Sequence, residues 1–152
     1  MDPQTEMREL QRLFEVAPHG AEFLSLQRSS KWGERIREEV IEGILLKQPE
    51  AIEDGVLFLE ENPRYFRTGY FKASIASKLK SVPLTESQRH RLREAILRAI
   101  TSNRVGPEFT EYARLAAVIV TSDFHEKVVG LRDRLSGWQR GRCERILNRI
   151  KE

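Results

Sequence analysis

The sequence has one cysteine, Cys143, and no long hydrophobic run among its 152 residues. A single cysteine excludes a disulfide within the chain and fits a reducing compartment. Cys143 falls on the apolar side of the last predicted helix, which indicates a buried, inert thiol. No apolar stretch approaches the 18 or more residues of a membrane span. The polar, acidic start is unlike a signal peptide, so we expect a cytoplasmic protein with no membrane partner.

The sequence also lacks the motifs of catalysis and metal binding. It has no Gly-rich phosphate loop, no nucleophile elbow and no paired carboxylates at a catalytic spacing. The three histidines, His19, His90 and His125, share no metal-ligand spacing. His125-Glu126 begins like a zinc-protease helix, but the second histidine position holds Val129. We therefore expect no catalytic residue, no cofactor and no metal site.

The composition predicts one helical domain with a strong charge asymmetry. Hydrophobic residues make up 39% of the chain, enough for a continuous core, and charged residues make up 32%. Residues 1–62 carry 7 basic and 14 acidic side chains, whereas residues 63–152 carry 19 basic and 9 acidic ones. Such an uneven distribution of charge orients a binding partner or attracts an anionic one.

Almost every segment has helical periodicity and a recognisable start signal, which predicts about nine helices and no strand. The predicted starts are Asp2-Pro3, Pro18, Ser29 or Ser30, Pro49, Asn62-Pro63, Thr85-x-x-Gln88, Pro107, Asp123-x-x-Glu126 and Ser136-x-x-Gln139. The apolar run 115–120 contains three β-branched residues, so a buried strand is the rival interpretation of that segment. Its continuity with the helical pattern that begins at Pro107 favours a helix.

One segment recurs along the chain. Residues 91–100 align without a gap with residues 35–44, and a weaker third copy spans residues 144–150. Self-similarity at an interval of roughly 50 residues is typical of helical arrays, in which each unit buries its apolar face on its neighbours. Ile44 and Ile100 occupy equivalent aligned positions, so we expect both to be buried.

Two segments resemble the second helices of HEAT or armadillo-type repeats. Asn62-Pro63, followed by Phe66-Arg67 and the small residue Ala73, fits the outline of those helices, and Pro107, Arg114 and Ala116-Ala117 fit it more loosely. The resemblance implies a right-handed array (residues 30–152) behind an N-terminal helical cap (residues 1–29), within a single all-helical domain (1–152). It also implies a curved binding surface, and most such repeats are not enzymes. The spacings of 56 and about 50 residues exceed the usual 40–47, so an irregular helical bundle is the alternative.

Small and aromatic residues within the predicted helices indicate packing. Gly43, Gly55 and Gly69 sit inside helices, where glycine costs up to about 1 kcal/mol relative to alanine, so they mark close helix crossings. Trp32 and Trp138 stand near the starts of repeat copies and are predicted to be packing residues.

Basic residues concentrate in residues 63–100, where aromatic residues interleave with them. The predicted binding face consists of Arg64, Arg67, Tyr70, Lys72, Lys78, Lys80, Arg89, Arg91, Arg93 and Arg98. The alternative is that these charges solvate helix backs or pair with the acidic helix at 49–61, while the aromatic residues lie in the core. The sequence predicts a non-enzymatic binding or adaptor scaffold that engages an acidic protein surface through this face. A nucleic-acid-binding protein using the same face is the second hypothesis, and a HEAT-like enzyme acting on nucleic acid is the third.

Overall fold

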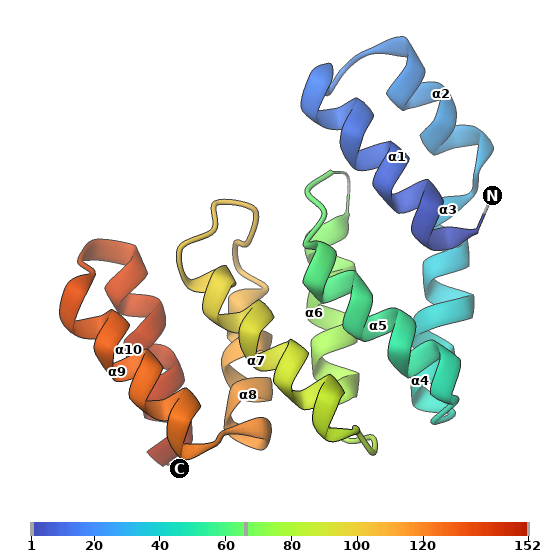
Figure 1. Cartoon of the computed structure of the whole chain (residues 1–152). Coiled ribbons are helices and arrows are strands. Elements are labelled where there is room, and N and C mark those ends of the chain that lie inside the picture. The colour runs from blue at the N-terminus through green and yellow to red at the C-terminus, as the bar shows by residue number, and fades with distance from the viewer. Residues whose placement is uncertain (1, 66, 152) are drawn as a thin grey trace.

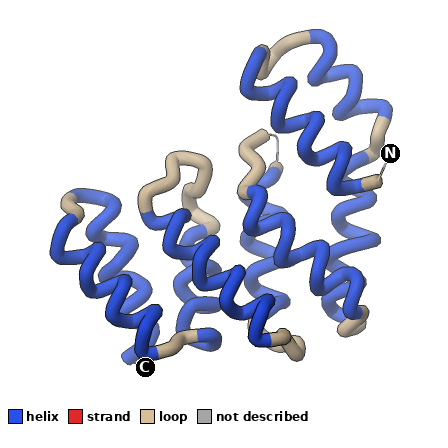
Figure 2. The backbone as a smooth tube through the Cα atoms, viewed as in Figure 1, coloured by secondary structure: helices blue, strands red, loops and turns tan. Residues whose placement is uncertain are grey.

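The structure, a computed structural model, describes residues 2–65 and 67–151. Its elements are α1 (Pro3–Val16), α2 (Ala21–Ser29), α3 (Trp32–Arg35), the π-helix η1 (Ile36–Ile41), α4 (Glu42–Leu45), α5 (Pro49–Glu61), α6 (Thr68–Leu79), α7 (Glu86–Ile100), α8 (Phe109–Ile119), α9 (Ser122–Arg134) and α10 (Gly137–Lys151). Because α3, η1 and α4 form one continuous helix, the described residues contain nine helices and no strand, as predicted (Figure 2).

The helices after residue 31 alternate between two layers (Figure 1). We call α5, α7 and α9 the front layer, and the α3–η1–α4 helix, α6, α8 and α10 the back layer. Within the back layer, α6 packs against η1 and α8, and α8 packs against α10. In the front layer α5 packs against α7, while α9 packs on α10 behind it. The α1–α2 hairpin caps one end, and the chain finishes at the other.

The helix spacing corrects the repeat that the sequence suggested. The front helices begin at residues 49, 86 and 122, at intervals of 37 and 36 residues rather than 50 or more. The aligned segments 35–44 and 144–150 lie in the back layer, whereas 91–100 is part of α7 in the front layer. Their similarity reflects the common pattern of an amphipathic helix, with charges outside and aliphatic residues inside. Ile44 and Ile100 are nevertheless both fully buried, which confirms that prediction.

Several helix starts follow the predicted local chemistry. The Asp2 side chain accepts from Thr5 N at the start of α1, and Pro49 occupies the first turn of α5. Thr85 and Gln88 form the predicted capping box of α7 with reciprocal hydrogen bonds of 3.0 Å. The run 115–119 lies in α8, so the rival strand interpretation is wrong.

Several predicted starts are wrong. Helix α2 begins at Ala21 after Gly20 rather than at Pro18, and Ser29 and Ser30 end α2 instead of beginning the next helix, which starts at Trp32. Asn62 does not begin a helix at Pro63: it ends α5 in the left-handed region (φ 50°), and α6 begins only at Thr68. Asparagine tolerates that conformation, which makes it a good helix end as well as a good helix start. Helix α9 is capped by Thr121, whose hydroxyl accepts from Phe124 N at 3.1 Å, and Asp123 lies inside its first turn.

The core confirms the packing roles predicted for Trp32, Gly43 and Gly55, whereas Gly69 faces the carboxylate of Glu108 rather than another helix. The Trp32 ring is buried, stacks on Phe58 and meets Tyr65 with ring centroids 5.0 Å apart. A Cβ on Gly55 would lie 2.7 Å from Ile44 Cδ1, so a larger residue there would require the Ile44 side chain to shift. The second tryptophan behaves differently from the prediction, because Trp138 is 55% exposed.

Two cations of the back layer hold the loop between α7 and α8. Lys72, fully buried on α6, donates from Nζ to the carbonyl of Arg104 at 2.9 Å. Arg142 of α10 donates to the carbonyls of Ala99, Ser102 and Val105 at 2.6, 2.9 and 2.5 Å. These carbonyls include groups at the end of α7 that no intrahelical N–H can satisfy. Both side chains thus fix the loop from neighbouring helices.

Replacing Arg142 by alanine is expected to lower the free energy of unfolding by about 2 kcal/mol, because carbonyls at a helix end lose a charged donor. The guanidinium also lies 5.0 Å from the Phe109 ring centroid and 4.6 Å from that of Trp138. Urea unfolding followed by circular dichroism measures the change. Arg98→Ala is the matched control, since Arg98 is exposed on α7 and surface changes usually stay within about 0.5 kcal/mol. Equal effects of the two substitutions would contradict the role of Arg142.

Candidate functional site

The ten residues of the predicted basic face are distributed over both layers. Arg64, Arg67 and Tyr70 are exposed at the turn between α5 and α6 and on the first turn of α6. Lys78 and Lys80 lie near the other end of α6. The predicted arginines of α7 belong instead to the front layer: Arg89, Arg91, Arg93 and Arg98. The structure therefore does not gather the ten residues into one face.

The acidic helix α5 neutralises Arg91, as the alternative interpretation of the basic block anticipated. Arg91 pairs with Glu60 at 2.5 Å and with Glu53 at 2.8 Å. The hydrogen bond that Arg91 donates to Glu60, followed by the one that it donates to Glu53, raises the pKa of the guanidinium above its ordinary value. The pair thus fastens α7 to α5.

Other members of the predicted face also serve the fold. Arg93 is almost buried and donates to the Ile119 carbonyl at 2.9 Å and to Glu86 at 2.6 Å. Arg89 pairs with the same carboxylate at 3.1 Å. Lys80 lies 3.5 Å from a carboxylate oxygen of α8, and Lys72 is the buried donor to the α7–α8 loop. Lys72 is thus no part of an exposed face, because its ammonium group is covered on all sides. The predicted aromatic neighbour Phe66 lies outside the described residues.

The back layer carries the surface that the sequence did not single out. Large hydrophobic side chains are exposed on each of its last three helices: Tyr70 on α6 (67%), Val118 on α8 (56%) and Trp138 on α10 (55%). Helices α6, α8 and α10 together hold eight basic and two acidic residues. Helices α5, α7 and α9 hold seven basic and ten acidic ones. Excess positive charge and exposed aromatic residues thus coincide on α6, α8 and α10.

We call this surface the back face and define it by the following residues on α6, α8 and α10: Tyr70, Arg114, Val118, Trp138 and Arg145. Arg114 stays about 41% exposed although it pairs with Glu111 at 2.5 Å in its own helix. Arg145 is exposed, with its guanidinium 5.5 Å from the Phe109 ring centroid. Arg145 and Trp138 were missed because α10 lies beyond the densest basic block. The five basic residues of α10 were the available signal.

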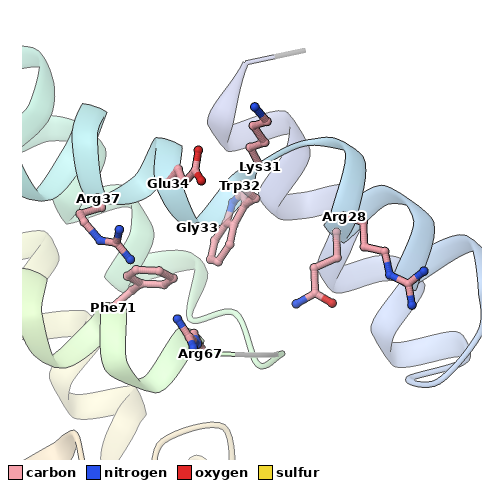
Figure 3. A pocket seen from close by; sticks show the side chains of 9 residues that line it. Arg28, Lys31, Trp32, Gly33, Glu34, Arg37, Arg67 and Phe71 are labelled. Atoms are coloured by element: carbon pink, nitrogen blue, oxygen red, sulfur yellow. The ribbon is translucent and has the colours of Figure 1, made fainter.

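A cleft of about 550 Å³ opens between α2, the α3–η1 helix and α6 (Figure 3). Its lining includes four cations, one acid and two aromatic residues: Arg28, Lys31, Arg37, Arg67, Glu34, Trp32 and Phe71. Figure 3 shows Arg37 and Arg67 on either side of Phe71, with the Trp32 ring facing them from α3. Lys31 and Glu34 point away from Phe71 in this view. Two guanidinium groups therefore lie beside an aromatic floor.

Three of the cleft cations differ from the paired cations of α7. Within the described residues, the side chains of Arg28, Lys31 and Arg37 make no hydrogen bond or ion pair. Two of the cations also have unusual backbones, because Lys31 (φ 49°) and Arg67 (φ 66°) adopt the left-handed region that non-glycine residues seldom occupy. Only Arg67 belonged to the predicted face. The others were missed because they precede the basic block, in the acidic part of the chain.

The described residues hold no group of three or more His, Cys, Asp or Glu side chains that could bind a metal ion. Cys143 is fully buried, as predicted, and burial raises the pKa of its thiol. Over the part of the chain that the structure covers, no helix is both long and apolar enough to cross a bilayer. Family models, curated proteins and solved structures were compared with the chain, and none of them matches it.

Proposed function

We propose that the protein is a non-enzymatic binding module, an adaptor or scaffold, whose back face docks a partner protein with an acidic surface. The observation that supports the proposal is the coincidence of exposed Tyr70 and Trp138 with the excess of arginine and lysine on α6, α8 and α10. Tyrosine, tryptophan and arginine dominate the binding energy of protein interfaces. A positive face attracts an acidic partner and speeds the encounter.

The arrangement of the helices favours the same role. Helical pairs stacked side by side at nearly constant intervals, as in HEAT-like arrays, expose one side of each helix in a layer over a broad surface. Because α6 packs on α8 and α8 packs on α10, the three helices present their outer sides next to one another. Such a surface suits an extended partner better than a small molecule.

A triple substitution on the back face tests the proposal. Tyr70→Ala, Arg114→Ala and Arg145→Ala together are expected to weaken partner capture by more than about tenfold, which corresponds to about 1.4 kcal/mol. The matched control is the triple variant His90→Ala, Arg98→Ala and Arg134→Ala on exposed positions of the front layer. The proteins captured by the parent and by both variants are quantified, and the affinity of each purified candidate partner is then measured. A partner that depends on the back face is lost from the back-face variant alone. Equal loss in both variants, or capture that neither variant reduces, would contradict the proposal.

Nucleic acid is the competing partner, because exposed aromatic residues and arginines also bind single strands. We expect labelled single- and double-stranded DNA and RNA to bind weakly at about 0.15 M salt, where the Debye length is about 8 Å. The five acidic residues of α5 would repel a long polyanion. Titrations of the labelled nucleic acids at two salt concentrations distinguish a nucleic-acid partner from a protein partner. Submicromolar, salt-sensitive binding that the back-face variant loses would replace the protein partner by nucleic acid.

A further inference from the structure

The first helix of the back layer carries charge of the opposite sign to the last one. Glu34, Glu38 and Glu42 are exposed along the α3–η1–α4 helix at intervals of four residues, and we call them the acidic stripe. None of their carboxylates makes a hydrogen bond or an ion pair among the residues that the structure describes. Like charges at this spacing repel one another on a helix. At the other end of the layer, α10 holds five basic residues and one acidic residue.

The acidic stripe faces away from the front layer. Ile36, Val40 and Ile44 are buried at the same interval of four residues, and η1 and α4 pack against α5 of the front layer. The three glutamates are offset from these residues by two positions, which places them on the opposite side of the helix. The stripe and the back face therefore belong to one outer surface of the back layer, acidic at its first helix and basic at its last (Figure 1).

We infer that the partner of the back face is a second copy of this chain, packed back layer against back layer about a two-fold axis parallel to the helices. The inference rests on the proposed function, because it names the partner of the same surface. The four helices of the back layer run in one direction (Figure 1). A two-fold axis parallel to them reverses their order, so the α3–η1–α4 helix of each copy lies over α10 of the other.

The reversal brings unlike charges together at both ends of the interface. Glu38 lies near the middle of its helix and meets the middle of α10, where Arg145 is exposed. Arg145 donates to the hydroxyl of Thr110, a neutral group, and no carboxylate among the described residues neutralises it. A two-fold axis across the helices would instead place α10 over α10. Charge complementarity therefore selects the axis parallel to the helices.

The centre of the interface is rich in exposed hydrophobic side chains. Tyr70 and Val118, which are 67% and 56% exposed, lie on α6 and α8, the two helices next to the axis. Aromatic residues at the centre with charges toward the rim are typical of protein interfaces. Four helices about 10 Å apart, each about as long as the 12 residues of α6, span roughly 700 Å². A stable interface needs about 800 Å² from each partner, so the surface is large enough.

The experiment is sedimentation velocity of the full chain over a series of concentrations. We expect the parent protein to form a species of twice the mass of one chain, and its association to weaken as salt screens the charges. Glu38→Arg and Arg145→Glu should each weaken association by about tenfold or more, because each change places like charges at two equivalent contacts. Arg98→Glu reverses an exposed charge on α7 in the front layer and is the matched control, expected to associate as the parent does.

A mixture of the two single variants distinguishes loss of this interface from loss of the fold. In a mixed dimer, the arginine introduced at position 38 meets the glutamate introduced at position 145, while Glu38 of one chain meets Arg145 of the other. Both contacts are thus restored, and the mixture should associate nearly as tightly as the parent. Tyr70→Ala leaves every charge in place and should still weaken association, because it removes an aromatic anchor from the centre.

Three results would overturn the inference: a parent protein that stays monomeric, equal weakening by Arg98→Glu and Glu38→Arg, or a mixture of the two single variants that does not associate. If the back-face triple variant still loses a different protein in that case, the proposed docking function stands and only the second copy is excluded as the partner. Restored association in the mixture, with no other protein depending on the back face, would refute the adaptor role and uphold the dimer.

Discussion

Replacing Ile44 by alanine is expected to lower the free energy of unfolding by about 2–5 kcal/mol. Ile44 is fully buried, and its Cδ1 fills the crossing between α4 and α5 beside Gly55. Alanine would leave a cavity that two crossing helices cannot close without moving. Urea unfolding measures the loss. Leu45→Ala is the matched control, because Leu45 is 59% exposed and surface changes usually stay within about 0.5 kcal/mol.

A double-mutant cycle with Gly55 makes this prediction specific to the crossing. Alone, Gly55→Ala would place a Cβ 2.7 Å from Ile44 Cδ1 and 3.2 Å from Ile75 Cγ2, so we expect a cost of about 1–3 kcal/mol. In the Ile44→Ala background the nearer atom is gone and the new methyl group partly fills the cavity. The second substitution should then cost much less than it does alone. Simple additivity would show that the two side chains do not meet as the structure places them.

The second large effect concerns pH and Lys72. Burial lowers the pKa of this ammonium group from 10.5 to about 8, although Glu108 nearby acts in the opposite direction. Between these values the unfolded chain holds the proton and the folded chain does not. Folding stability therefore rises with pH across this window. Relative to Lys72→Met, the parent protein should gain about 3 kcal/mol of unfolding free energy between pH 7 and pH 11.

The comparison with Lys72→Met removes the contributions of other groups. Burial raises the pKa of Tyr65 and Tyr112, so both oppose folding above about pH 10, but they do so equally in the two proteins. Chemical unfolding at a series of pH values gives the difference directly. Lys78→Met, on the same helix, controls for the loss of one positive charge. A difference between parent and Lys72→Met that does not change with pH would show that Lys72 is not buried as an ammonium group.

The features that the sequence predicted are those that depend on neighbouring residues. Helix starts depend on residues within a single turn, such as the capping box of Thr85 and Gln88 or Pro49 in the first turn of α5. They can therefore be inferred without knowledge of the fold. Burial of Ile44 and Ile100 follows from helical periodicity in the same way. The number of helices was therefore accessible from local chemistry alone.

The features that the sequence did not predict depend on which helices meet. Arg91 is neutralised because α7 packs on α5, which brings it to carboxylates 31 and 38 residues away. The cleft unites Arg37 of a π-helical turn with Arg67 at the left-handed start of α6. The residue types in the π turn do not distinguish it from an α-helix. Arginine and lysine seldom adopt positive φ, so their presence does not predict the left-handed backbone. A map of basic residues along the chain thus identified the charge but not the places where it converges.

The order in which the helices pack has a kinetic consequence. Helices that pack closely are either neighbours in the chain, such as α9 and α10, or separated by a single helix, such as α6 and α8. Short loops close at low entropic cost, and proteins rich in local contacts fold within microseconds to milliseconds. Because the two ends of the chain lie at opposite ends of the molecule, the α1–α2 hairpin can open and close again without first separating α8 from α10. Local unfolding can therefore begin at an end and advance helix by helix, while the far end keeps its structure.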